Sequence, residues 1–531
     1  MLNRILFEEH ILLNRNAEFP ARYIAACNLH SLAQSEPRNI SIETVVNLEQ
    51  LMHDPLITRQ RHSFFLLREI AQTMTAIGAG SAPELATQSL AALKRVLHSA
   101  AGASHRAAAA ALGSLPVPIP HHVQSEASRQ NEIPSISLRE ITELSGCGSQ
   151  EKIVYAGRSL MLPFPSEQKI LVIKLARGDD SSESLFAETQ WMKNLSNYAP
   201  HMPVRFNIPE PFPLYGCAVF RLKNPLPAAR QGAEKAYADP MAIAFTAHAD
   251  YFAYANDPTQ YQHAAQFKEV MIRNAWLFGY LASQGMIHTA PIPLFHNRIQ
   301  RNRREDNGLY DWPRGGRLDQ WLASCRHPNF GLTGTRDFEH IEAISASGEK
   351  LYWHLGSHIL SLLLVSASFF RHKNSNLQGW TSAGKPIDAR HLFDMNLLIE
   401  IISETLQGYY QGFTGHAYEG EMPFDVSRLT SRMVEEMGVD RHMEEILRRI
   451  DQQQMTANEF RLFLQERGFS QKKAATMSQA VKDMVLLTGP HLGGFNQGIS
   501  IPELIDATAA MAATCVLGKF AGKNLSHIEE T

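Results

Sequence analysis

A lysine inside an apolar run is the first residue in this sequence that could do chemistry. Lys174 belongs to ILVIKLA (170–176), whose β-branched residues predict a strand buried on both faces. A buried ammonium group is costly unless a carboxylate pairs with it. Glu188 shares one face of a predicted helix (182–195) with its apolar residues. We expect a lysine–glutamate pair that could hold phosphate groups; the alternative is an edge-strand lysine whose amine reaches solvent.

A second group of candidates follows a predicted helix at 265–285. The stretch MIHTAPIPLFHN (286–297) falls where protein kinases carry the catalytic loop HRDxxxxN. His288 fits the histidine, whereas Thr289 and Ala290 replace the arginine and the catalytic aspartate. Asn297 could be the metal-binding asparagine, although it stands two residues later than the motif requires. Without a carboxylate at 290, no side chain there can accept the proton of a substrate hydroxyl.

The stretch NFGLTGTRDFEHIE (329–342) contains the candidate metal ligands. Asn329, with the phenylalanine and glycine after it, resembles the kinase DFG triplet with asparagine in place of aspartate. An asparagine oxygen can still bind Mg²⁺, and Asp337 and Glu339 could restore the missing carboxylate. We predict Asn329 and Asp337 as metal ligands, with Asn297 as a weaker third. The alternative is a glycine turn leading into a helix that Asp337 caps, with His340 playing no part.

Other residues could contact nucleotide phosphates. Gly157 separates two predicted strands, where a kinase has its glycine-rich hairpin, although a lone glycine there is also an ordinary turn. The basic run HNRIQRNRR (296–304) supplies Arg298 and Arg301. Guanidinium groups suit phosphate, although such a run is by default a solvated loop.

The elements that must position these residues follow from hydrophobic periodicity. Around the lysine strand we predict strands at 151–157, 158–164 and 217–222, and helices at 182–195, 241–257, 265–285, 349–370 and 391–413. The segment 508–520 predicts a helix of small residues that packs closely on another element. Before the strands, helices are predicted at 63–78, 82–101 and 104–116. Their small contact residues suggest HEAT-type stacking or an irregular helical domain.

We therefore expect an α+β chain with a bilobal, protein-kinase-like domain between two helical regions. The expected parts are a helical, HEAT-like domain at 1–120, a linker at 121–145, lobes at 146–225 and 226–425, and a helical extension at 426–531.

Composition narrows the class of protein. Of 531 residues, 44% are hydrophobic and 19% charged, which is typical of folded chains. A net charge of −3 gives no general attraction to nucleic acid, and the longest apolar run (359–370) is too short to span a membrane. The five scattered cysteines form no CxxC pair, and Glu8 and Glu9 interrupt the apolar N-terminus, unlike a signal peptide. We expect a cytoplasmic protein; an effector secreted without a classical signal peptide is the alternative.

The lysine strand, the helix glutamate, the altered loop and NFGLTGTRD together resemble the bacterial pseudokinases related to SidJ, over roughly residues 150–420. The resemblance implies a kinase-like fold that uses ATP and Mg²⁺ to adenylate a protein carboxylate. The amino group of free glutamate then attacks the acyl-adenylate, which glutamylates the protein. Because a carboxylate is already a nucleophile at neutral pH, this chemistry needs no aspartate base.

The resemblance also implies roles for particular residues. Lys174, held by Glu188, would contact the phosphates, while His288, Arg298 and Arg301 could contact nucleotide or the adenylated intermediate. A protein substrate is the expected partner, and a protein activator a second one, because SidJ is activated by calmodulin. Three alternatives stay open: direct AMP transfer (AMPylation), a scaffold without catalysis, and an unorthodox protein kinase.

Overall fold

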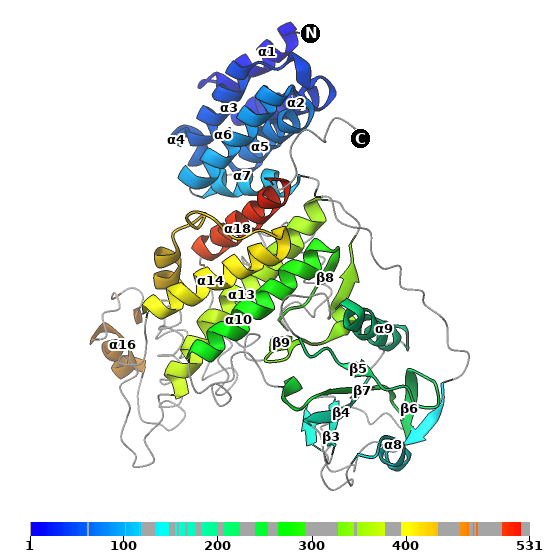
Figure 1. Cartoon of the computed structure of the whole chain (residues 1–531). Coiled ribbons are helices and arrows are strands. Elements are labelled where there is room, and N and C mark those ends of the chain that lie inside the picture. Colours follow the sequence, from blue (N-terminus) through cyan, green and yellow to red (C-terminus); the bar gives the residue numbers. More distant parts are fainter. Residues whose placement is uncertain are drawn as a thin grey trace.

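The computed structural model has an α+β architecture in which N-terminal helices, a mixed sheet and a helical bundle follow one another along the chain (Figure 1). The structure describes residues 2–60, 63–100, 102–115, 117, 133–147, 154–156, 159–164, 168–176, 182–198, 206–223, 239–252, 264–292, 328–344, 348–376, 395–433, 457–466, 471, 474–475 and 502–521.

The N-terminal helices pack around α5, which contacts α2, α6 and α7. They are α1 (Leu2–Leu13), α2 (Phe19–Ser35), the 3₁₀ helix η1 (Pro37–Asn39), α3 (Ile42–His53), α4 (Pro55–Thr58), α5 (Ser63–Gly80), α6 (Pro83–Ser99) and α7 (Ala103–Gly113). The three helices expected from periodicity in this region are present as α5, α6 and α7. Alanines at 107–109 and 111 are buried, so α7 lies close to its neighbours.

Within the described residues, seven strands form one sheet in the order β1-β6-β7-β4-β3-β2, and β5 also pairs with β7. The strands are β1 (Ser135–Ser137), β2 (Val154–Ala156), β3 (Ser159–Pro163), β4 (Lys169–Leu175), β5 (Glu210–Pro211), β6 (Val219–Lys223) and β7 (Met241–His248). Only β1 runs parallel to its described neighbour, β6; the other pairs are antiparallel. The strand expected around Lys174 is therefore an interior strand, β4.

The strand β7 contradicts the helix predicted at 241–257. Its residues MAIAFTAH pair with β4 on one side and with β5 and β6 on the other, and the chain then enters the 3₁₀ helix η5 (Ala249–Phe252). Most of β7 is buried on both faces, so the polar–apolar alternation that identifies a strand is absent. The same sheet thus continues beyond residue 225, where we expected the first lobe to end.

The two faces of the sheet are covered by different helices. Leu171 and Ile173 of β4 face a core shared with α8 (Leu138–Ser145), which begins with a capping box at Ser137. Ile170 and Val172 face the opposite core, shared with α9 (Ser182–Tyr198). Because strand side chains alternate, Lys174 lies on the α9 face.

Long helices form the remaining layer. They are α10 (Ala264–Ser283), α13 (Gly348–Asn376), α14 (Met395–Thr414) and α18 (Pro502–Ala521), with the shorter α16 (Ala457–Glu466). In Figure 1, α18 lies between the N-terminal helices and the bundle, in agreement with its contacts to α7, α13 and α14. Residues of α18 are buried nearly all round, so the prediction of a closely packed helix of small residues is confirmed.

Short β pairs connect the bundle to the sheet. They are β8 (Met286–His288) with β11 (Ile341–Ala343), and β9 (Phe330–Gly331) with β10 (Gly334–Thr335). The 3₁₀ helix η8 (Phe338–His340) lies between β10 and β11 and packs against α9.

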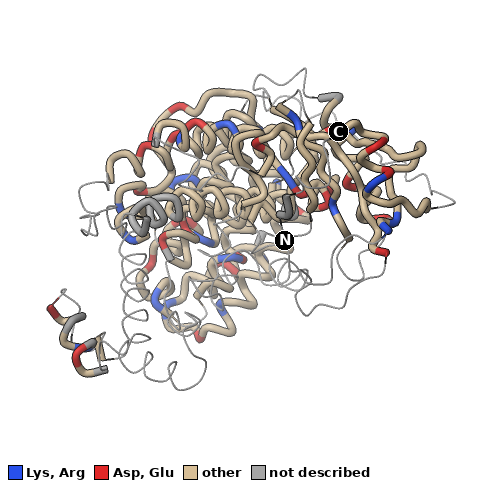
Figure 2. Tube along the Cα trace, turned by 90° about the horizontal axis from the view of Figure 1, so that it is seen from below, with Lys and Arg blue, Asp and Glu red and all other residues tan. Residues whose placement is uncertain are grey.

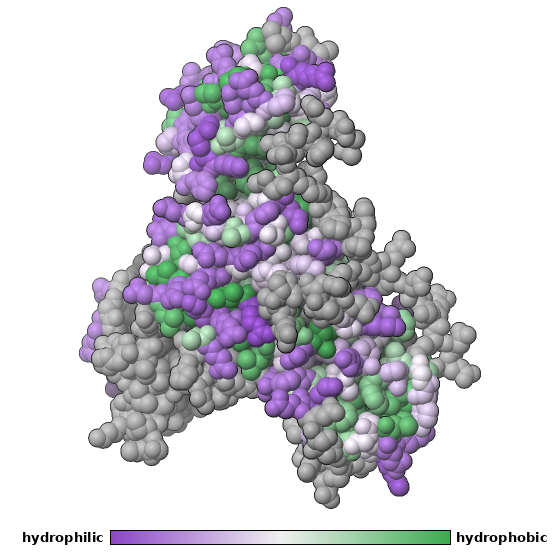
Figure 3. All heavy atoms as spheres, in the orientation of Figure 1, coloured by the Kyte–Doolittle hydropathy of each residue, from purple (hydrophilic) through white to green (hydrophobic). Residues whose placement is uncertain are grey.

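The surface of the described residues carries both signs of charge, dispersed along the trace (Figure 2). The face seen in Figure 3 is mostly hydrophilic, with hydrophobic patches. Among the described helices, none combines the length and apolar character needed to cross a bilayer.

Candidate functional site

Lys174 and Glu188 form the buried ion pair that we expected. Lys174 Nζ lies 2.7 Å from Glu188 Oε1, and the lysine is 3% exposed while the glutamate is fully buried. The pair joins the centre of the sheet to α9. Since β4 is flanked by β3 and β7, the alternative of an edge-strand lysine reaching solvent is excluded.

Two further carboxylates lie around the same amine. Asp337 Oδ1 is 3.1 Å and Glu339 Oε1 is 3.6 Å from Lys174 Nζ. Asp337 is the more open of the two, with 30% of its side chain exposed. A ligand approaching from solvent would therefore meet Asp337 first.

Asp337 has an unusual backbone conformation, with a φ of +52°. This left-handed region costs a residue other than glycine on the order of 1 kcal/mol, although aspartate tolerates it better than most. Asp337 stands at the N-cap position of η8, but its side chain makes no cap hydrogen bond and contacts Lys174 instead. The alternative of a capping aspartate is therefore wrong.

Burial raises the pKa of Glu188 to about 7. Desolvation of the carboxylate is the largest cause, and the nearby charges of Glu339 and Asp337 add to it. Lys174 acts in the opposite direction, but its single charge is shared among three carboxylates. The second oxygen of Glu188, Oε2, is buried and has no hydrogen-bond partner among the described residues.

Asn329 directly precedes the β9–β10 hairpin, so the expected DFG-like triplet lies at the start of that hairpin. Phe330 and Gly331 form β9, which pairs with β10, and Asp337 follows the hairpin and reaches Lys174. A hairpin turn also contains glycine, so the two patterns look alike in sequence. The nearly buried Asn329 donates from Nδ2 to Ala290 O, and its carbonyl accepts from Arg336 N–H. Asn329 is thus fixed beside the residue that precedes Asp337.

His288 holds the backbone next to Asp337. Its Nε2 lies 2.7 Å from Arg336 O, and its Nδ1 accepts from Ala290 N–H at 3.3 Å. A ring that donates from one nitrogen and accepts at the other is neutral. His288 is fully buried, and the structure gives it a positioning role, while its direct contact with nucleotide stays a prediction.

Two residues near the site were missed from the sequence. His340 Nε2 lies 3.5 Å from Glu339 Oε1, which is itself 3.6 Å from Lys174 Nζ, so His340 lies next to the site. Tyr251 is buried, and its pKa is raised well above the ordinary value by burial and by the charges of Asp337 and Glu188. It was missed because 241–257 was predicted as a helix. The close spacing of two acids and a histidine at 337–340 was the available signal for His340.

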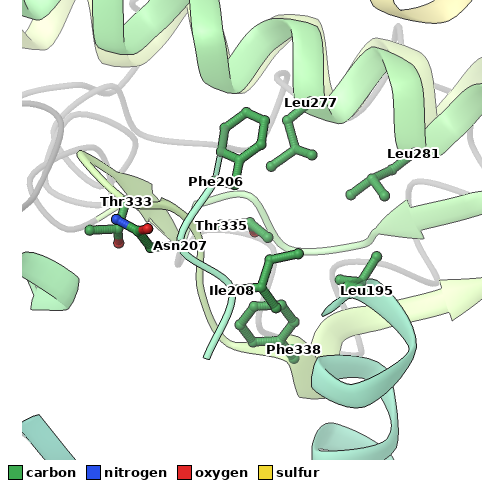
Figure 4. Close-up of a pocket in the computed structure, with 9 residues that line it drawn as sticks. All are labelled: Leu195, Phe206, Asn207, Ile208, Leu277, Leu281, Thr333, Thr335 and Phe338. Atoms are coloured by element: carbon green, nitrogen blue, oxygen red, sulfur yellow. The ribbon is translucent and has the colours of Figure 1, made fainter. Parts of the chain in front are cut away.

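A small pocket lies behind Phe338, between α9, α10 and the β9–β10 hairpin (Figure 4). Figure 4 shows Phe338 grouped with Leu195 and Ile208, below Leu277 and Leu281 of α10. Its volume of about 10 Å³ is room for about one water molecule. The pocket is too small for a nucleotide, and its apolar residues fix Phe338 and thereby the adjacent Asp337.

Four predicted site residues lie outside the described residues: Gly157, Asn297, Arg298 and Arg301.

The charges at Lys174 suit a divalent cation. One ammonium group faces three carboxylates, and one carboxylate oxygen has no partner among the described residues. Such a surplus of negative charge repels a bare polyphosphate but attracts a metal ion that could accompany it. Asp337 and Asn329 both carry the oxygen atoms that Mg²⁺ prefers, and the Asn329 backbone is hydrogen-bonded to Arg336, the residue before Asp337.

Comparison with known proteins does not assign this chain to a family. A scan against models of protein families gave no match, and a search of curated proteins found none either.

Proposed function

We propose that this chain is an ATP- and Mg²⁺-dependent pseudokinase that modifies a protein, either by adenylating a carboxylate and ligating glutamate to it or by transferring AMP. The proposal includes a bilobal kinase-like domain built from the sheet and the α10–α14 bundle, and a HEAT-like domain before it. One observation carries the proposal: an interior-strand lysine is paired with a glutamate on the next helix and with an aspartate that follows a hairpin. Protein kinases use this combination to hold ATP.

The order of residues around the hairpin supports the proposal. In kinases, the catalytic-loop asparagine and the DFG aspartate hold the metal ions. Here Asn329 precedes the β9–β10 hairpin, and Asp337-Phe338 follows it, with Glu339 in place of the glycine. With the motifs aligned in this way, Asn329 is the counterpart of the catalytic-loop asparagine, a role we first considered for Asn297. The same alignment makes Asp337 the counterpart of the triplet aspartate.

Each residue then has a defined task. The Lys174 amine would neutralise charge on the phosphates, and Glu188 would hold the amine in place against α9. Asp337 and Asn329 would hold Mg²⁺, which when bound neutralises phosphate oxygens. His288, through the Arg336 carbonyl, would fix the backbone from which Asp337 projects.

The absence of a catalytic base at residue 290 favours a substrate group that is already ionised. Ala290 and Thr289 are buried where a kinase has its catalytic aspartate and arginine. A protein carboxylate needs no deprotonation: its oxygen attacks the α-phosphorus, the bond to the bridging oxygen breaks, and pyrophosphate leaves. The free amino group of glutamate then attacks the acyl carbon, loses a proton to solvent, and AMP leaves as the amide forms.

A scaffold is the second candidate. The N-terminal helices expose large apolar side chains, including Leu6, Phe7 and Ile24, each more than half exposed. Contiguous apolar patches mark surfaces that bind another protein, whereas single exposed apolar residues are common. In this alternative, the helices recruit a partner and the Lys174 site has no chemical step.

Labelled ATP separates these possibilities. Without glutamate, we expect label from the α-phosphate, but not from the γ-phosphate, on protein. With ATP, Mg²⁺ and glutamate, mass spectrometry of the chain should find added glutamate if the adenylate is aminolysed, or added AMP if AMP is the transferred group. Lys174→Ala and Asp337→Ala should each reduce the transfer at least about 100-fold, as is usual for loss of one electrostatic contact in a site of this kind.

Two controls keep this test decisive. Lys169→Ala removes an exposed lysine from the same strand and should leave transfer unchanged. Circular dichroism should verify that each variant folds. Transfer of γ-label would instead assign an unorthodox kinase. Because AMP leaves a glutamylated product, the scaffold is supported only if protein carries neither label and no added glutamate mass.

A further inference from the structure

We propose that Asp337, Glu339 and His340 form a divalent-cation site that binds Mn²⁺ without nucleotide. This goes beyond the proposed function, which needs Mg²⁺ only as a companion of ATP held by Asp337 and Asn329. The new ligands are Glu339 and His340.

The geometry brings three ligand atoms together on one short turn. One ligand atom from each of Asp337, Glu339 and His340 lies within 4.8 Å of the other two. In octahedral geometry with ligands at about 2.1 Å, neighbouring ligand atoms are about 3.0 Å apart and opposite ones about 4.2 Å apart, so the three side chains would have to close around a bound ion. The turn is held firmly, because Phe338 is buried against α9 and Asp337 is fixed at a positive φ.

The balance of charge independently indicates a cation. Lys174 supplies one positive charge, while Glu188, Asp337 and Glu339 supply up to three negative charges. One divalent cation would bring this group to neutrality. In addition, Oε2 of the fully buried Glu188 has no hydrogen-bond partner among the described residues, and its carboxylate touches the same amine as Asp337 and Glu339. A buried carboxylate oxygen without a donor is costly, and a nearby cation reduces that cost.

The ligand types select the metal. Mg²⁺ prefers oxygen ligands and near-ideal octahedral geometry, whereas an imidazole nitrogen suits the transition metals. Two carboxylates and one imidazole, partly open to solvent through Asp337, suit a first-row transition metal with water completing its shell; Mn²⁺, which also accepts carboxylate and water oxygens, is the probe. Glu339 Oε1 lies between the Lys174 amine at 3.6 Å and the His340 ring at 3.5 Å, so it would connect the lysine to the metal.

The test is a titration of the full chain with Mn²⁺ in the absence of nucleotide, followed by electron paramagnetic resonance. We expect one saturable site whose dissociation constant rises at least tenfold in Glu339→Gln and in His340→Gln. Pulsed measurements should detect coupling of Mn²⁺ to an imidazole nitrogen in the wild type and lose it in His340→Gln. Glu342→Gln, which removes an exposed carboxylate from the adjacent β11, is the matched control and should bind as the wild type does.

The proposal is overturned if no saturable site exists, if the nitrogen coupling persists in His340→Gln, or if both variants, folded by circular dichroism, bind Mn²⁺ like the wild type. Lys174→Met separates this inference from the proposed function. It should bind ATP at least about tenfold more weakly yet retain Mn²⁺, because the amine is no ligand of the metal. Loss of Mn²⁺ in folded Lys174→Met would also count against the site.

Discussion

At the scale of single residues, the protonation of the site's carboxylates depends on the one positive charge that lies among them. Glu188 is fully buried beside one lysine that two other acids also approach. Its pKa is therefore raised to about 7 in the folded protein, above the ordinary value of 4.5. The folded state then binds more protons than the unfolded state between these values, so folding stability falls as pH rises through this interval.

Glu188→Gln should remove that pH dependence. Glutamine imitates the protonated acid, so the variant and the wild type should be most similar in stability near pH 5. By pH 8 the wild type should have lost up to about 3 kcal/mol relative to the variant. Urea unfolding at both pH values measures the difference, with Glu342→Gln as the control. Parallel pH curves for the wild type and Glu188→Gln would show that Glu188 is ionised in both folded and unfolded protein.

The ion pair could be predicted from sequence because each partner follows a local rule. A lysine in an apolar strand needs a carboxylate, and helical spacing places Glu188 on the inner face of the next helix. The role of His288 could not be predicted, since it depends on two backbone groups brought together by folding. Glu339 was noted only as a spare carboxylate, because its proximity to Lys174 requires a contact between distant parts of the chain.

At the scale of elements, hydrogen bonding between distant strands explains why the helix predicted at 241–257 is a strand. An alanine-rich run such as 241–248 fits a helix locally, but β4, β5 and β6 offer it hydrogen-bond partners on both sides. The helices α5, α7, α9 and α10 were predictable because each has a continuous apolar face. The hairpin β9–β10 was not, because its strands are very short.

The contact between α10 and α14 depends on glycine and yields a prediction. A Cβ at Gly412 would collide with the backbone oxygen of Trp276, whereas at Gly408 it would lie 3.2 Å from its nearest atoms on Ile272. Gly412→Ala should therefore destabilise the protein by about 1–3 kcal/mol, because a backbone must move to make room. Gly408→Ala, on the same helix, should cost clearly less. Chemical denaturation of both variants measures this, and equal stabilities would contradict the close approach of the two helices.

At the scale of the whole molecule, α18 joins the N-terminal helices to the bundle, while the Lys174 site lies by the sheet and α9 (Figure 1). His105 and Arg106 of α7 contact Asp506 of α18, so the junction includes polar contacts as well as apolar packing. This arrangement leaves the N-terminal helices free to present exposed apolar side chains away from the site.

The proposed activity requires that Lys174 hold the triphosphate of ATP. Isothermal titration calorimetry of the full chain with ATP and Mg²⁺ tests this most directly. We expect the wild type and Lys169→Met to bind alike, and Lys174→Met to bind at least about tenfold more weakly, because loss of one charged contact to phosphate costs at least 1.4 kcal/mol or so. A Lys174→Met/Glu188→Gln variant, which leaves no unpaired acid on α9, should bind equally weakly. Unchanged ATP binding in these folded variants, or no binding by the wild type, would contradict the account.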